Sequence, residues 1–390
     1  MNKKSNVWFV MTKLVAVCII LSLAMGCAPK ARKAGGYMDT PLSHYKEGMK
    51  YYNDGKYDQA KEEFNLATSL DNKYAPAYAG LALVTAQKGD FKEAIKLAEK
   101  CQSLDNKIVD GFVAKGIVIT MQNEGKPAKE WLKDVENEYE KALKIDPQNS
   151  EVYYRRGVCY KKAYEFGKAA GDFKKVIELK KDWTKEADDQ WQLVQMIERA
   201  APGTDVGKRI ALVEKISRAD IAALFVSELQ IDKLVEKKRP KNYDNSYKAP
   251  TDAREMKVDS LVKTADLTDI GSHWAKNFIM DIVGLKIRGL EPYPDHTFHP
   301  DQLVNRGEYA MVVEEAIIAI LRDPSLSTKH IGSQSRFPDV NPSHPSYNAI
   351  CNAVDKGVMD AEMNGEFGLQ KSVSGPEALL VIRKLKNLQK

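Results

Sequence analysis

Three short segments carry the polar side chains whose spacing has the clearest chemical meaning. Each begins with Ser or Asn and has an acid three residues later, the spacing of a helix N-cap and its capping-box partner. The acids are therefore expected to stabilise helix starts. Two segments also place an Arg at the first helical position, where it needs no partner in the fold and could bind an anionic group. The segments are Ser217-Arg218-Ala219-Asp220, Asn305-Arg306-Gly307-Glu308 and Ser374-Gly375-Pro376-Glu377; an Arg introduced in the third, in place of Gly375, could add a site.

Other polar side chains do not have the spacing that catalysis or metal binding requires. His296 and His299 lie beside Asp295, but no fourth metal ligand is obvious. The sequence contains no Gly-x-Ser-x-Gly, phosphate-binding loop or dinucleotide fingerprint, and no nucleophile with a recognisable base. We therefore expect no enzymatic activity and no metal or other cofactor. The net charge of +5 is mild and no basic stripe with interleaved aromatics occurs, so nucleic acid is not an expected partner.

The first 27 residues have the pattern of a secretory signal. Two lysines near the start precede an apolar run at residues 14–26, which is short for a membrane span. The run closes on Leu-Ala-Met-Gly-Cys at 23–27, which resembles a bacterial lipobox. The resemblance implies cleavage before Cys27 and its acylation with chains such as palmitate, with sorting to the outer membrane if the source has two membranes. An uncleaved anchor helix is the alternative, although Lys13 would be costly within it. Residues 28–40 are expected to form a short flexible linker.

Small residues recur 34 positions apart in the next part of the chain. Gly48, Ala82 and Gly116 show this spacing, as do Ala60 and Ala94. Such positions let paired helices approach closely, while aromatic residues fill the gaps between neighbouring pairs. The period and pattern resemble the tetratricopeptide (TPR) repeat. The resemblance implies a helical solenoid over residues 41–200, in which the helix at 184–200 caps the last repeat.

In TPR arrays the first helix of each repeat lines the concave face. Carried over by position, this face would bind a protein or peptide partner. Its apolar and aromatic character suits an apolar peptide or helix. The alternative, equally open from the sequence, is that some of these side chains pack on the next repeat. The candidate partner-binding residues are Tyr45, Tyr52, Leu83, Ile117 and Tyr154.

The three capped segments belong to a second repeated pattern. Residues 268–308 contain, in order, Asp-Ile, His-Trp-Ala, Tyr-Pro-Asp, Phe and Arg-x-Glu, which resembles the S-layer homology (SLH) module of proteins held on cell-wall glycans. The resemblance implies a three-copy helical prism over residues 203–390, and glycan contacts from Arg218 and Arg306. Trp274 could stack on a sugar ring, although a core position is the alternative. The prism would comprise a partial first copy, an insertion at 230–267, a second copy at 268–321 and a third at 336–388.

These patterns together predict a mainly α protein of the cell envelope, anchored by lipid at its N-terminus. The SLH copies would bind cell-wall polysaccharide or peptidoglycan, and the TPR repeats would bind a protein partner, so that the chain acts as a tether or scaffold. The alternative is an assembly factor for envelope export or polysaccharide secretion, in which the SLH remnant is only structural.

Overall fold

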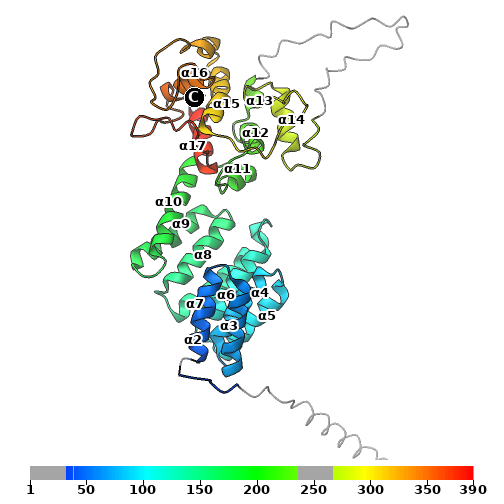
Figure 1. Ribbon diagram of the computed structural model, residues 1–390, viewed down its shortest axis with the longest axis vertical. Helices are drawn as coiled ribbons and strands as arrows, with labels where there is room; N and C mark the ends of the chain where they lie inside the picture. Colours follow the sequence, from blue (N-terminus) through cyan, green and yellow to red (C-terminus); the bar gives the residue numbers. More distant parts are fainter. Residues whose placement is uncertain (1–31, 38, 236–266, 390) are drawn as a thin grey trace, which may run out of the picture. The chain divides into compact units, whose positions relative to one another are not determined.

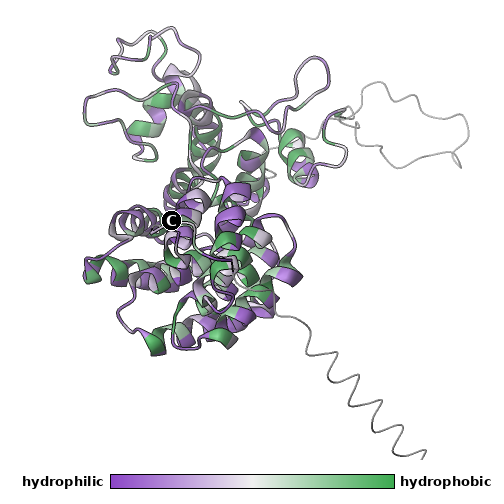
Figure 2. Ribbon diagram, turned by 60° about the horizontal axis from the view of Figure 1, so that its bottom comes forward, coloured by the Kyte–Doolittle hydropathy of each residue, from purple (hydrophilic) through white to green (hydrophobic). Residues whose placement is uncertain are grey.

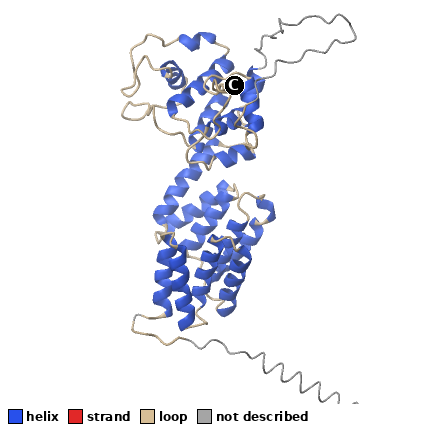
Figure 3. Cartoon of the chain, turned by 45° about the vertical axis from the view of Figure 1, so that its right-hand side comes forward, coloured by secondary structure: helices blue, strands red, loops and turns tan. Residues whose placement is uncertain are grey.

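The computed structural model describes residues 32–37, 39–235 and 267–389 (Figure 1). The predicted signal segment with Cys27, the start of the linker and most of the insertion lie outside the described residues. The described part of the chain is helical, with loops and two isolated β-bridges (Figure 3), which confirms the predicted mainly α class. None of the described helices is long and apolar enough to span a membrane. The chain divides into two compact units, residues 1–163 and 164–390.

The first unit is a stack of antiparallel helix pairs. Pairs α2–α3, α4–α5 and α6–α7 pack side by side, and each pair contacts the next helix along the chain. Figure 2 shows that these helices carry both hydrophobic and hydrophilic residues, whereas α4 is buried over most of its length. The elements are α2 (Pro41–Asn53), α3 (Tyr57–Leu70), α4 (Ala75–Gln87), α5 (Phe91–Leu104), α6 (Asp110–Gln122), η1 (Ala128–Glu130), α7 (Leu132–Ile145) and α8 (Ser150–Lys162).

The recurring small residues stand where helices of the stack come closest. A Cβ atom at Gly48 would lie 2.6 Å from a ring carbon of Phe64, and one at Gly116 would lie 2.8 Å from the ring of Tyr139. Both rings are fully buried, and Ala82 has no exposed surface. The prediction that the 34-residue period reflects close helix packing is therefore confirmed.

The second half of the predicted linker is held on the first repeat. The Asp39 carboxylate accepts hydrogen bonds from the Arg32 guanidinium (2.5 Å) and the Gly35 amide (2.6 Å), and it contacts His44 (2.7 Å). The Gly35 amide and then His44 lower the pKa of Asp39 to about 2. His44 also contacts Glu63 of α3 at 2.6 Å. The linker is thus attached to the solenoid before α2 begins and is not flexible throughout.

The second unit contains two further solenoid helices and the module that follows them. Helix α10 packs against both α9 and α17, so the predicted capping helix buries a second face against the C-terminal module. Helix α10 thus lies in the second compact unit, and the predicted end of the solenoid at residue 200 stays a prediction. The elements are α9 (Phe166–Leu179), α10 (Thr184–Ala200), α11 (Asp205–Ile210), α12 (Arg218–Ser227), α13 (Ile231–Val235), α14 (Lys276–Gly284), α15 (Arg306–Leu321), η4 (Pro324–Thr328), α16 (Tyr347–Asp355) and α17 (Gly375–Asn387).

The predicted insertion begins inside the folded core. Its first residues form α13, whose Ile231 is completely buried and which contacts α12 and α15. The start of the range 230–267 is therefore part of the fold, and residues 236–266 lie outside the described residues.

Three extended segments meet at the centre of the C-terminal module, each just before α12, α15 or α17. The amide of Ile216 donates to the carbonyl of Val373 (2.9 Å), and the amide of Val304 donates to the carbonyl of Ile216 (3.1 Å). The Arg306 amide in turn donates to Lys371 (2.9 Å), so every segment pairs with both others. The Ile and Val side chains at the centre are buried. The three copies thus close on one another, as the resemblance implied.

A buried carboxylate joins α12 to the segment after α10 and to α17. Glu228 accepts from the amides of Gly203 (2.9 Å) and Thr204 (2.7 Å), from the Thr204 hydroxyl (2.7 Å) and from the Lys386 ammonium (3.0 Å). Burial alone would raise the pKa of Glu228, but these donors outweigh it and lower the pKa. The first copy is therefore fixed at both ends of α12, by this network and by its capped N-terminus.

Candidate functional site

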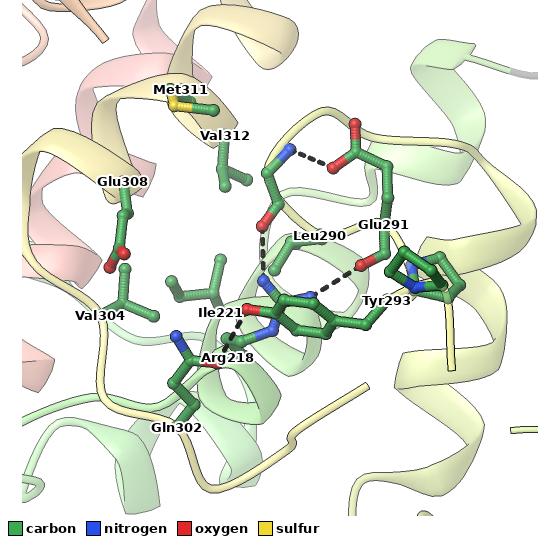
Figure 4. Close-up of a pocket in the computed structure, with 13 residues that line it drawn as sticks. Arg218, Ile221, Leu290, Glu291, Tyr293, Gln302, Val304, Glu308, Met311 and Val312 are labelled. Carbon is green, nitrogen blue, oxygen red and sulfur yellow. Dashed lines mark hydrogen bonds between the residues drawn. The ribbon is translucent and has the colours of Figure 1, made fainter. Parts of the chain in front are cut away.

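A groove of about 300 Å³ lies between the first and second copies of the C-terminal module (Figure 4). One wall comes from the start of α12, the second from the loop after α14, and the third from the start of α15 and the residues before it. The first wall precedes the other two by about 70 residues or more in the sequence and meets them because the three copies close in a ring. The lining residues are Arg218, Ile221, Gly289, Leu290, Glu291, Pro292, Tyr293, Pro294, Gln302, Val304, Glu308, Met311 and Val312.

The Arg218 side chain cross-links α12 to the loop of the second copy. Its guanidinium donates to the carbonyl oxygens of Phe298, Gly289 and Glu291, each at 2.9 Å, and only 8% of the residue is exposed. Burial lowers the pKa of Arg218, which the nearby Tyr293 and Glu291 partly offset. The expectation that this Arg needs no partner in the fold is therefore wrong. It has three, because the ring closure brings a loop from about 80 residues later onto the helix start.

A second Arg repeats this arrangement one copy later. Arg306 donates to the carbonyl oxygens of Phe367 (2.9 Å) and Asp360 (2.7 Å), and its third nitrogen pairs with the Glu377 carboxylate. Its side chain is 12% exposed. Arg306 thus also has partners within the fold, and the expectation that it is free is wrong for the same reason.

An Asp in each complete copy orients the loop carbonyl that the Arg uses. Asp269 accepts from the amides of Phe298 (2.9 Å) and His299 (2.7 Å). Asp339 accepts from the amides of residues 367–369 at 2.8–2.9 Å. Burial would raise the pKa of Asp339, but the three amides outweigh it and lower the pKa. Sequence reasoning gave these acids no role, although their 70-residue spacing, close to that of the phenylalanines, was a signal for it.

The capping boxes form in the first two copies only. The side chains of Ser217 and Asp220, and of Asn305 and Glu308, exchange hydrogen bonds with each other's backbone as predicted. In the third copy the Ser cap is present, but Glu377 is used as the partner of Arg306 instead. Helix capping therefore accounts for the role of Asp220 and Glu308, but not for that of Glu377.

The backbone around Gly375 leaves no room for a side chain at this position. A Cβ atom there would overlap the carbonyl oxygen of Ile210, at the end of α11, and the Gly375 amide donates to the Val213 carbonyl at 2.8 Å. The shortened first copy thus occupies the space that an Arg would need in the third copy. The expectation that an Arg introduced at this position could add a site is wrong.

Trp274 lies outside the groove. Trp274 is 44% exposed, so the alternative of a core position is wrong, whereas its stacking on a sugar ring stays a prediction. The Arg209 guanidinium lies 3.8 Å from the centre of the indole ring, and Phe278 meets it edge-on at 6.4 Å. Arg209 therefore already covers one face of the ring.

The groove presents an aromatic ring, an amide and two carboxylates to solvent. Tyr293 is 37% exposed and donates its hydroxyl hydrogen to the Gln302 side chain (2.9 Å). Glu291 accepts from the Gly289 amide (2.7 Å), and Glu308 accepts from the Asn305 amide (3.0 Å). Within the described residues no group of His, Cys, Asp and Glu side chains could hold a metal ion. The groove thus offers hydrogen-bonding groups and the face of one aromatic ring.

Two of the predicted partner-binding residues of the solenoid serve packing instead. Leu83 is 6% exposed and belongs to the main core cluster of the first unit. Tyr45 donates to the Asp110 carboxylate (2.8 Å) and its ring packs against Phe64 and Tyr74. Burial and then Asp110 raise the pKa of Tyr45. The alternative that such residues pack on the next repeat holds for both.

The other three candidates are half-buried. Tyr52 lies 5.7 Å from the Tyr57 ring and accepts from the Gln87 side chain (3.2 Å). Ile117 packs on the core cluster with part of its side chain exposed, and Tyr154 lies beside a guanidinium on α8. These three residues keep surface that a partner could contact.

Sequence profiles of two families match the chain. Profiles described as tetratricopeptide repeat match residues 43–74, 75–108 and 138–171, and the S-layer homology domain profile matches residues 266–310 and 336–378. The chain therefore contains TPR repeats and an SLH domain.

Two curated relatives match about a third of the chain each. The chain is 28% identical over 146 residues to a UDP-N-acetylglucosamine–peptide N-acetylglucosaminyltransferase of Giardia intestinalis, covering 37% of this chain and 9% of that protein. It is 31% identical over 118 residues to the Hsp70-Hsp90 organizing protein of Triticum aestivum, covering 30% and 19% respectively. The chain thus spans less than a fifth of the length of either relative. A thermophilic TPR protein of Thermus thermophilus superposes with a TM-score of 0.37 and 16% identity, over 50% of this chain and 95% of that one.

Proposed function

We propose that this protein is a non-enzymatic lipoprotein of the cell envelope, which binds wall glycan through the groove between its first two SLH copies and a protein partner through its TPR repeats. The SLH domain supports association with a cell-wall polymer, and the TPR repeats support protein binding. The observation that carries the proposal is the groove itself. Its loop is locked by three hydrogen bonds from one buried guanidinium, so the exposed Tyr293 and Gln302 are positioned before any ligand arrives. Such preorganisation lowers the entropic cost of binding.

Sedimentation with purified cell wall tests this function. The unacylated mature chain should sediment with the wall, and Tyr293→Ala should weaken binding about tenfold or more, because truncating a central aromatic contact typically costs about 2 kcal/mol. Trp274→Ala removes an exposed aromatic outside the groove and should bind as the wild type does. If only the Trp274 variant loses binding, the glycan-binding site is the surface around Trp274 and not the groove.

The runner-up function predicts a different result in the same assay. If the SLH domain is only structural and the protein is an assembly factor for export or polysaccharide secretion, the wild type will not sediment with the wall. Partner capture by the solenoid would then persist.

The lipobox-like segment at residues 23–27 supports a lipid anchor on Cys27. Cys27→Ser should abolish incorporation of labelled fatty acid and shift the protein from the detergent phase to the aqueous phase in phase partitioning. Mutating the buried Cys101 to Ser serves as the matched control and should leave both readouts unchanged. A wild type recovered unacylated from envelope fractions would contradict the anchor.

The half-buried aromatic residues of the solenoid support binding of an apolar peptide or helix. The double change Tyr52→Ser and Tyr154→Ser should lower recovery of a co-purifying envelope protein at least about tenfold, as expected when two aromatic contacts are lost. Tyr153→Ser, on the same helix as Tyr154, should not. Thermal melting of each variant shows whether the solenoid stays folded. Unchanged recovery in a folded double variant would assign these tyrosines to packing.

A further inference from the structure

A single imidazole joins the N-terminal linker to the first solenoid repeat. His44 lies near the start of α2, and its Nε2 atom is 2.7 Å from the carboxylate of Asp39 in the linker. Its Nδ1 atom is 2.6 Å from the carboxylate of Glu63 on α3. The imidazole thus bridges two acids from different segments, and only 18% of its side chain is exposed to solvent.

This bridge is complete only when the imidazole is protonated. An ionised carboxylate only accepts hydrogen bonds, whereas a neutral imidazole has one N–H donor and one lone pair. A neutral His44 could therefore donate to Asp39 or to Glu63, and its other nitrogen would face a carboxylate oxygen with no hydrogen between them. Only the imidazolium donates to both acids at once.

The surrounding contacts favour the protonated state. Burial would lower the pKa of His44, but the hydrogen bonds to Glu63 and Asp39 outweigh it and raise the pKa. Asp39 also accepts from the guanidinium of Arg32 (2.5 Å), whose amide donates to the carbonyl of Ser69 at the end of α3 (2.6 Å). Because the pKa of Asp39 is lowered to about 2, this carboxylate stays ionised near neutral pH. His44 therefore changes charge at or above neutral pH while Asp39 does not.

We propose that His44 is a pH-dependent clasp, which holds the linker from Arg32 to Asp39 on α2 and α3 while it is protonated and releases the linker when it loses its proton. The clasp itself needs no lipid. If Cys27 carries the proposed anchor, however, the clasp also sets the length of the tether. At about 3.6 Å per residue, the chain from Cys27 reaches at most about 18 Å to Arg32 and about 43 Å to Asp39. Release would thus let the solenoid lie further from its membrane.

The direction of the pH dependence follows from the sign of the shift. Folding raises the pKa of His44 above its ordinary value of 6.5, so the clasp is closed below about pH 6.5 and opens as the pH rises through the raised pKa. Hydrogen exchange of the full chain, read by mass spectrometry, measures this change. Each rate is divided by the intrinsic exchange rate at the same pH. We expect the protection of the Arg32, Gly35 and Asp39 amides to fall at least about tenfold between pH 6 and pH 9, because a charge-assisted hydrogen bond is lost.

Two variants separate the bridging role of His44 from ordinary packing. His44→Gln carries no charge at any pH, so protection of the linker should already be low at pH 6 and should not change at pH 9. Glu63→Gln replaces the second carboxylate by an amide, which can accept from the imidazolium or donate to the lone pair of the neutral ring. The clasp should therefore stay closed at both pH values in this variant. Glu62→Gln removes the neighbouring exposed acid on α3 and is the matched control; it should show the same fall as the wild type.

Equal protection of the wild-type linker at pH 6 and pH 9 would overturn the proposal. A fall in Glu63→Gln as large as in the wild type would also overturn it, because the pH dependence would then not come from an imidazole between two acids. If His44→Gln also exposes the amides of α2 and α3, that variant unfolds the repeat, and Glu63→Gln decides the question. Neither acylation nor wall binding enters these measurements, so their failure would leave the proposed function standing.

Discussion

Arg218→Ala should lower the free energy of unfolding of the second unit by about 3–5 kcal/mol, since each hydrogen bond to a charged group contributes about 1.5–3 kcal/mol and solvent recovers part of the loss. The change removes three bonds and leaves the carbonyl oxygens of Gly289, Glu291 and Phe298 without their donor. For a unit of this size the melting temperature should fall by roughly 10 °C. Urea unfolding and thermal melting measure the effect.

Two variants show whether geometry or charge carries this stability. Arg218→Lys keeps the charge but cannot reach three carbonyls from one ammonium, so it should recover less than half of the loss. Arg209→Ala removes an Arg that stacks on the half-exposed Trp274 and should cost less than about 1 kcal/mol. If Arg218→Ala melts as the wild type does and yet loses wall binding, the guanidinium contacts the ligand directly, as the sequence alone had indicated.

Gly375→Ala should lower the free energy of unfolding by about 3 kcal/mol, the upper end of the usual cost of overpacking. The added methyl group would overlap the Ile210 carbonyl oxygen, which is backbone and cannot rotate away. Either α11 or the start of α17 must move, and the bond from the Gly375 amide to Val213 is then strained or lost. Gly375→Arg should be at least as unstable and should gain no wall binding.

Gly171→Ala is the matched control for this substitution. Gly171 lies inside α9, in the same unit, and an added Cβ would meet no atom within 4 Å. Ala should therefore stabilise the unit by about 0.5–1 kcal/mol through its higher helix propensity. If Gly375→Ala melts as the wild type does, α11 can leave its position, and the third copy retains room for a site.

The sequence by itself determined the helices, their repeats and the caps of α12 and α15. These features depend on residues within a few positions of one another, or on a period that many residues share. Gly48 and Gly116 recur because every helix pair meets the same packing constraint. The capping boxes at Ser217 and Asn305 close over three residues, so their spacing is complete in the sequence.

Tertiary structure alone decided which polar side chains remain available to a ligand. Arg218 and Arg306 stand at equivalent helix starts, where the sequence alone suggests that their side chains are free. Their partners lie 54 to 80 residues further along the chain. The space beside Gly375 is filled by Ile210, which is still more distant in sequence. A guanidinium binds the nearest acceptors that the folded chain presents. The ring closure of the three copies decides which carbonyl oxygens lie near each guanidinium. For this reason the sequence located the groove's Arg, and only the fold showed that Glu291, Glu308 and Tyr293 line the same groove.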